Sequence, residues 1–176
     1  MELDERDVGR FSNQTQDARW HDHKIVIYTD AACAENGKDD CKAAYAIYLN
    51  NKSNYNRQAC IKNPKDYLTT GILTNNRAEI IARIEALKLA KQYNFSKIEI
   101  RTDSKWVVDY FRLFRKLRLQ EVQNGKNPEW RMDRKILYLL KRYASTVEEV
   151  TFVHIPGQSY DLSNLEVDKM AKQELE

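Results

Sequence analysis

The order in which strand-like and helix-like segments follow one another limits this chain to few folds. Five segments carry the β-branched, aromatic and apolar residues typical of strands, at 24–29, 43–49, 57–61, 97–102 and 147–155. Helical spacing of apolar residues predicts helices at 76–93, 104–117 and 130–144, and a capping box at 163–166 opens a last one. The resulting order, βββαβααβα, predicts an α/β fold with helices packed on a mixed sheet.

Length and composition favour a single soluble globular domain. A chain of 176 residues can bury a sizeable core, and its residues are 31% charged and 42% hydrophobic. No run approaches the roughly 18 apolar residues of a membrane span, so we expect no membrane association, and we expect a monomer. Residues 1–22 are polar and aperiodic, which predicts a flexible tail followed by one domain over 23–176.

The cysteines and the N-terminus bear on the compartment. Cys33, Cys41 and Cys60 cannot all pair, and their spacing matches no zinc motif, so we expect free thiols in a reducing compartment. The acidic N-terminus lacks an apolar run, so we expect neither a secretory signal nor a typical transit peptide. Both observations favour the cytoplasm or the nucleus.

Four acidic residues stand where predicted elements begin or end. Asp30 closes the first strand and Asp103 follows the fourth, and we expect these two strands to be parallel neighbours. Glu79 and Asp168 lie in the early turns of two helices. A carboxylate at the end of a buried strand is costly unless it is paired or bound to a cation, and converging carboxylates suit hard divalent ions. This pattern predicts metal-dependent phosphoryl chemistry.

Each acid alone also has a simpler interpretation. Asn76 and Glu79 have capping-box spacing, so Glu79 would only cap a helix. Asp168 would interact favourably with the dipole at the start of its helix, and Asp30 and Asp103 would be turn residues. The sequence around the acids is what makes these interpretations less attractive when the four are taken together.

Four ordered segments closely resemble type 1 ribonuclease H, over about residues 24–172. They are 28–33 (YTDAAC), 74–79 (TNNRAE), 102–104 (TDS) and 154–157 (HIPG), the last leading to Asn164 and Asp168. The resemblance implies the ribonuclease H-like fold, a five-stranded mixed sheet with helices on both faces. It also implies hydrolysis of the RNA strand of RNA–DNA hybrids, leaving 5′-phosphate and 3′-hydroxyl ends. Two Mg²⁺ or Mn²⁺ ions would be held, with substrate, by Asp30, Glu79, Asp103 and Asp168.

The resemblance also implies residues that contact the hybrid. Asn75 and Asn76 would contact the RNA strand with Asn36 as a third residue, because an amide both donates to and accepts from a 2′-hydroxyl. Thr74 would bind a DNA phosphate together with Asn127, and Trp106 would lie near the DNA backbone. The alternatives are that Asn75 and Asn76 cap the helix and that Trp106 is a core residue.

The segment 112–134 is strongly basic. Its basic residues are Arg112, Arg115, Lys116, Arg118, Lys126, Arg131 and Arg134. Only Glu121, Glu129 and Asp133 oppose them. The resemblance implies a protrusion that grips the hybrid with salt-dependent affinity, and the alternative is a solvated helix face.

The chain departs from the family pattern at two places. The loop 34–41 is acidic and lacks the usual glycine- and proline-rich turn. Gln158 stands where the family carries a mobile histidine, and an amide does not titrate near neutral pH, so we hypothesise slower turnover. These departures leave two alternatives: a catalytically weak or inactive hybrid-binding module, and another nuclease or transposase of the same general fold.

Overall fold

The computed structural model describes residues 19–36, 40–50, 53–114, 124, 133–157 and 161–176. Its centre is a mixed sheet with the strand order β4-β3-β2-β5-β6, in which the short β1 also pairs with β2. The strands are β1 (Arg19–His21), β2 (Lys24–Ala34), β3 (Lys42–Tyr48), β4 (Arg57–Cys60), β5 (Lys97–Thr102) and β6 (Glu149–His154). β1, β3 and β4 run antiparallel to their neighbours, whereas β5 and β6 join β2 in parallel.

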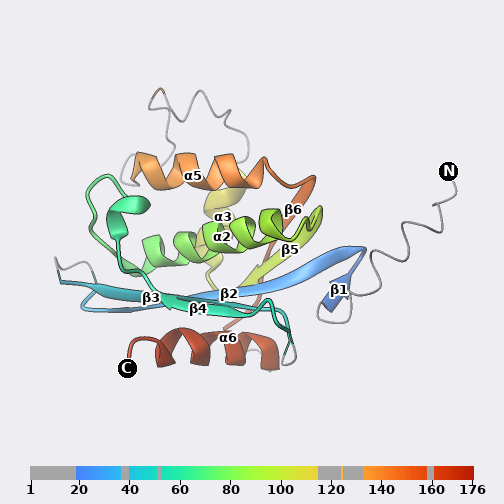
Figure 1. The fold of residues 1–176 in the computed structure, drawn as a ribbon, viewed down its shortest axis with the longest axis horizontal. Coiled ribbons are helices and arrows are strands. Elements are labelled where there is room, and N and C mark those ends of the chain that lie inside the picture. The colour runs from blue at the N-terminus through green and yellow to red at the C-terminus, as the bar shows by residue number, and fades with distance from the viewer. Residues whose placement is uncertain (1–18, 37–39, 51–52, 115–123, 125–132, 158–160) are drawn as a thin grey trace, which may run out of the picture.

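Helices cover both faces of this sheet, as Figure 1 shows. α2 (Asn75–Gln92), α3 (Lys105–Phe114) and α5 (Arg134–Ala144) lie on one face, and α6 (Leu162–Gln173) lies on the other. A short 3₁₀ helix, η2 (Pro64–Asp66), precedes α2. The predicted α/β fold with helices on both faces is confirmed. Within the described residues, no helix has the length and apolar composition that crossing a membrane requires.

The core has one layer on each side of the sheet. Because side chains alternate along a strand, Ile25 and Ile27 of β2 pack toward α2, while Val26 and Tyr28 pack toward α6. A strand that is buried on both faces appears in the sequence as a continuous apolar run, which is why β2 is recognisable there. β2 therefore lies between two helical layers.

The predicted tail is wrong at its C-terminal end. Arg19–His21 form β1, and Trp20 pairs with Ile25. The turn between β1 and β2 consists of Asp22 and His23, both with positive φ (47° and 62°). Two such residues form the tight turn that suits a hairpin, and aspartate and histidine tolerate this conformation better than most residues. Residues 1–18 lie outside the described part of the chain.

The predicted free thiols are wrong for two of the three cysteines. Cys33 and Cys41 form a disulfide, with Cα atoms 6.7 Å apart, and Cys60 is free. The hairpin explains the pairing, because Ala34 of β2 lies opposite Lys42 of β3 and brings the two cysteines together at its end. The sequence does not reveal this register.

Helix α6 begins differently from the prediction. Ser163 and Glu166 do not form a capping box, because Ser163 is already the second residue of the helix. Asp161 is the N-cap residue, and its Oδ1 accepts hydrogen bonds from the backbone N–H groups of Ser163 (3.0 Å) and Asn164 (3.2 Å). An aspartate serves this purpose as well as a serine. The helix therefore starts one residue before the predicted box.

Candidate active site

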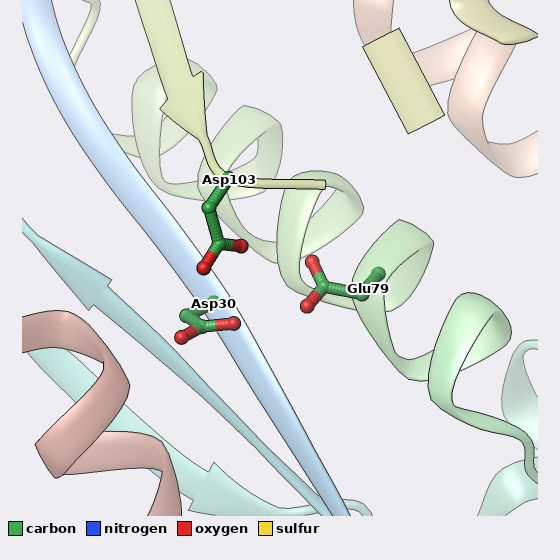
Figure 2. Close-up of side chains that lie close together, drawn as sticks. All are labelled: Asp30, Glu79 and Asp103. Carbon is green, nitrogen blue, oxygen red and sulfur yellow. The ribbon is translucent and has the colours of Figure 1, made fainter. Parts of the chain in front are cut away.

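Three of the four predicted acids meet at one place. One carboxylate oxygen each of Asp30, Glu79 and Asp103 lie within 4.8 Å of one another, and Figure 2 shows the side chains pointing toward a common centre. They come from β2, from α2 and from the residue that follows β5. We call these three side chains the acidic cluster.

Strand pairing explains how Asp30 and Asp103 meet. β2 and β5 are parallel, with Tyr28 opposite Arg101, so both aspartates come two residues after that pair. The prediction that these two strands are parallel neighbours is confirmed. The prediction that Asp30 ends its strand is wrong, because β2 continues to Ala34 by pairing with β3. The residues after Asp30 are small, so the sequence pattern fades although the antiparallel hydrogen bonds continue.

The third carboxylate, that of Glu79, comes from helix α2. Thr74 is its N-cap residue, and the Thr74 Oγ1 accepts a hydrogen bond of 3.2 Å from the Arg77 backbone N–H. Glu79 is therefore the fifth residue of the helix, too far along to cap it. Its side chain instead accepts a hydrogen bond of 2.8 Å from the guanidinium of Arg83. The capping interpretations of Glu79, Asn75 and Asn76 are thus wrong.

The acidic cluster is electrostatically strained. Asp30 is only 4% exposed and Glu79 is also buried. Burial, followed by the charge and hydrogen bond of Glu79 and the charge of Asp103, raises the pKa of Asp30 from 3.8 to about 9. A hydrogen bond of 2.8 Å from the Ala31 N–H opposes this rise only partly. Three close carboxylates, of which the buried Asp30 resists ionisation, are a donor set that a divalent cation fits.

Asp168 lies on α6 and is not a member of the acidic cluster. Its Oδ2 accepts a hydrogen bond of 2.7 Å from Lys172, one helical turn later. This hydrogen bond raises the pKa of Lys172, and the charges of Asp168, Asp30 and Asp103 add to the effect. The field of the cluster thus reaches α6. Asp168 is also the seventh residue of α6, beyond the first turn where the helix dipole acts most strongly.

The end of β6 and the residues that follow it lie close to Asp103. The Nε2 of His154 lies 3.1 Å from the backbone oxygen of Asp103. The backbone of Gly157 also approaches it, because a Cβ at this position would lie 3.4 Å from Asp103 Oδ2. Gln158, the next residue along the chain, lies outside the described residues.

The residues expected to contact the hybrid gather at the start of α2. Asn75 and Asn76 are its first two residues and are exposed. The Oδ1 of Asn36 accepts a hydrogen bond of 2.8 Å from the Asn75 N–H, which ties the 34–36 segment to this helix. Thr74, the N-cap residue, is partly buried beside them.

The other predicted contacts lie around α3. Trp106 is 37% exposed and stacks on Tyr110, with ring centroids 5.2 Å apart, so the core interpretation of Trp106 is wrong. Asn127 and most of the basic segment lie outside the described residues. Arg112 and Arg134, at the two ends of that segment, are exposed.

Arg83 is a site residue that the sequence reasoning missed. It lies four residues after Glu79, and the spacing alone is that of an ordinary surface ion pair. The usable signal was its context, because the flanking residues Ala82 and Ile84 are apolar and buried. An arginine in a helix that is buried on most sides requires a buried partner.

The fold and the site together define a class of proteins. In this class, an α/β sheet and a helix packed on it bring several carboxylates together at one edge of the sheet. Within that class, the family model of RNase H matches residues 22–176, so this chain belongs to the RNase H family. Ribonuclease H1 of Rattus norvegicus is 30% identical over 160 residues, covering 85% of this chain and 49% of the relative. Ribonuclease H of Ehrlichia chaffeensis is 32% identical over 160 residues, covering 87% of this chain and 95% of the relative.

The solved structures agree on the fold. LC11-RNase H1, solved in complex with an RNA/DNA hybrid, has a TM-score of 0.52 at 20% identity, covering 87% of this chain and all of that chain. The chain spans about half the length of the rat relative that it matches. The resemblance to type 1 ribonuclease H is confirmed at the level of family and fold.

Proposed function

We propose that this chain is an endoribonuclease that hydrolyses the RNA strand of RNA–DNA hybrids by two-metal-ion catalysis, leaving 5′-phosphate and 3′-hydroxyl ends. The observation that carries the proposal is the acidic cluster, with a buried Asp30 whose pKa is raised to about 9 by burial and by its two acidic neighbours. Membership of the RNase H family supports the choice of substrate, as does the hybrid bound to the similar LC11-RNase H1.

The acidic cluster and Asp168 are the residues that would hold Mg²⁺ or Mn²⁺. When bound, a pair of such ions supplies Lewis acidity that lowers the pKa of a water and stabilises the leaving oxygen. The acidic cluster is formed before the substrate arrives, and Asp168 would join it when the metal binds. Asp30 lies on the central strand, Glu79 is anchored by Arg83, and Asp168 would exchange its hydrogen bond with Lys172 for the cation.

Helix α2 supplies the contacts that would select RNA. Asn75 and Asn76 are exposed one turn before Glu79, so a ribose bound to these amides would lie next to the acidic cluster. An amide that donates to and accepts from a 2′-hydroxyl separates RNA from DNA. The start of a helix also favours a phosphate, which suits Thr74 as a contact to the DNA strand.

The test is cleavage of end-labelled duplexes of one sequence. We expect the RNA strand of the RNA–DNA hybrid to be cut with Mg²⁺ or Mn²⁺, while duplex RNA, duplex DNA and the DNA strand of the hybrid stay intact. The products should carry a 5′-phosphate and a 3′-hydroxyl. Hybrid binding without cleavage in either metal would favour the inactive binding module instead. Action as a monomer in the cytoplasm or nucleus stays a prediction.

A further inference from the structure

The largest fully buried side chain of the described residues is a charged one. Arg83 is 0% exposed and lies on α2 among the apolar residues Ile80, Ile84 and Leu87. Its Nη1 donates to the Glu79 Oε2 (2.8 Å) and to the Glu79 backbone oxygen. Its Nη2 donates to the hydroxyl of Thr102, the last residue of β5. One guanidinium therefore joins the helix that carries Glu79 to the strand that Asp103 follows.

Stability alone does not account for an arginine at this position. Removing a guanidinium from water is costly, and apolar residues of similar size in place of a buried ion pair often keep or raise stability. Nε of Arg83 is also buried and finds no partner among the described residues, which adds to the cost. The neighbours on α2 are apolar, so an apolar pair at positions 79 and 83 would suit them, whereas an apolar residue at position 83 alone would leave the buried Glu79 carboxylate unpaired.

We propose that Arg83 is a positioning residue that fixes Glu79 and the end of β5 relative to each other, so that Glu79 and Asp103 present their carboxylates to the same divalent cation. The proposal rests on the proposed function, because it presupposes that the acidic cluster binds a cation. Arg83 itself touches neither metal nor substrate.

The shape of the guanidinium is what suits it to this task. Its donors point in fixed directions within one plane, so Nη1 and Nη2 can hold two acceptors at a set separation. Here the acceptors are Glu79 and Thr102, and Asp103 follows Thr102 directly. A lysine would keep the positive charge but would lack this fork. Comparing lysine with arginine therefore separates geometry from charge.

The experiment measures binding of Mn²⁺ alone by isothermal titration calorimetry, without nucleic acid. The variants are Arg83→Lys, Arg83→Met and Thr102→Val, which removes the hydroxyl that Nη2 contacts. The matched control is Leu87→Ala, which opens a cavity in the same helix without touching the acids. We expect both Arg83 variants to bind Mn²⁺ about 10- to 100-fold more weakly than the native chain, the range typical when a residue that orients a metal ligand is lost. Thr102→Val should shift in the same direction, and Leu87→Ala should bind as the native chain does.

Four other results are possible, and each would contradict a different part of this proposal. If the native chain does not bind Mn²⁺, the proposed function fails. If it binds and the Arg83 variants match it, the positioning role fails and the proposed function stands. Native affinity in Arg83→Lys with a loss in Arg83→Met would mean that charge acts and geometry does not. An equal loss in Leu87→Ala would reduce the effect to general destabilisation. Should Arg83→Met fail to fold, Arg83→Lys and Thr102→Val decide.

Discussion

Replacing Asp30 with asparagine should stabilise the metal-free protein above neutral pH. In the native fold, burial first, and then Glu79 and Asp103, raise the pKa of Asp30 from 3.8 to about 9. The folded protein therefore keeps a proton that the unfolded chain releases. Stability from this group is fully present below about pH 4 and is lost as pH rises toward 9.

The size of this effect follows from proton linkage. One proton contributes at most about 1.4 kcal/mol per pH unit, so between pH 5 and pH 8 the metal-free native protein should lose up to about 4 kcal/mol of unfolding free energy. The amide introduced by Asp30→Asn does not titrate. We expect this variant to exceed the native protein by on the order of 2–4 kcal/mol at pH 8, which for a chain of this size is a rise in Tm of about 5–15 °C.

The assay is thermal unfolding in EDTA at several values of pH from 5 to 8. Glu148→Gln is the matched control, because it removes an exposed carboxylate near the opposite end of β5, where Glu148 pairs with Lys97 at 3.4 Å. We expect the control to follow the native pH dependence within about 0.5 kcal/mol. Adding Mg²⁺ at pH 8 should raise the Tm of the native protein and not that of Asp30→Asn. Parallel curves for Asp30→Asn and the native chain would refute the reasoning.

Three further predictions concern Glu99, Asn36 and Gln158. Burial opposes ionisation of Glu99, but hydrogen bonds from His21 and Arg101 lower its pKa, so its contribution is present at neutral pH and lost below about pH 4.5. Glu99→Gln should lower the free energy of unfolding at pH 7 by about 1–3 kcal/mol in a urea titration, and this free energy should then fall less steeply at acidic pH. An unchanged urea midpoint would contradict this prediction. Asn36→Ala should lower stability by about 1 kcal/mol in the same assay by removing the acceptor at the start of α2, whereas Asn36→Asp keeps the acceptor and should stay near native. Gln158→His should raise the rate of hybrid cleavage and add a pH dependence near about 6.5, and an unchanged rate at all pH values would remove the hypothesis that Gln158 limits turnover.

The parts of the fold that depend on local pattern are predictable from the sequence. β2 is recognisable as a buried apolar run and β5 by isoleucines that alternate with charged residues, and Asp30 and Asp103 indicate a shared edge of the sheet. β1 escapes prediction because three residues hold no pattern, and its existence depends on the positive φ of Asp22 and His23. The Cys33–Cys41 disulfide depends on the register of the hairpin formed by β2 and β3, which the sequence does not show.

The acidic residues of the site can be predicted from the sequence, but their surroundings cannot. Asp30, Glu79 and Asp103 can be named because their sequence contexts resemble a family. The apolar neighbours of Arg83 point to its burial, but the sequence does not show that α2 is covered both by the sheet and by α5. Tertiary packing, not local propensity, decides this burial. The pairing of Asp168 with Lys172, in contrast, is a local i,i+4 contact within α6.

The most direct test of the central claim compares the native chain with Asp103→Asn on one RNA–DNA hybrid in Mg²⁺. This substitution keeps the shape of the side chain while removing one carboxylate from the acidic cluster. We predict that cleavage of the RNA strand falls by at least about 10²-fold, while the variant stays folded and still binds the hybrid. Cleavage by Asp103→Asn at the native rate would contradict the account, because the acidic cluster would then not be the active site.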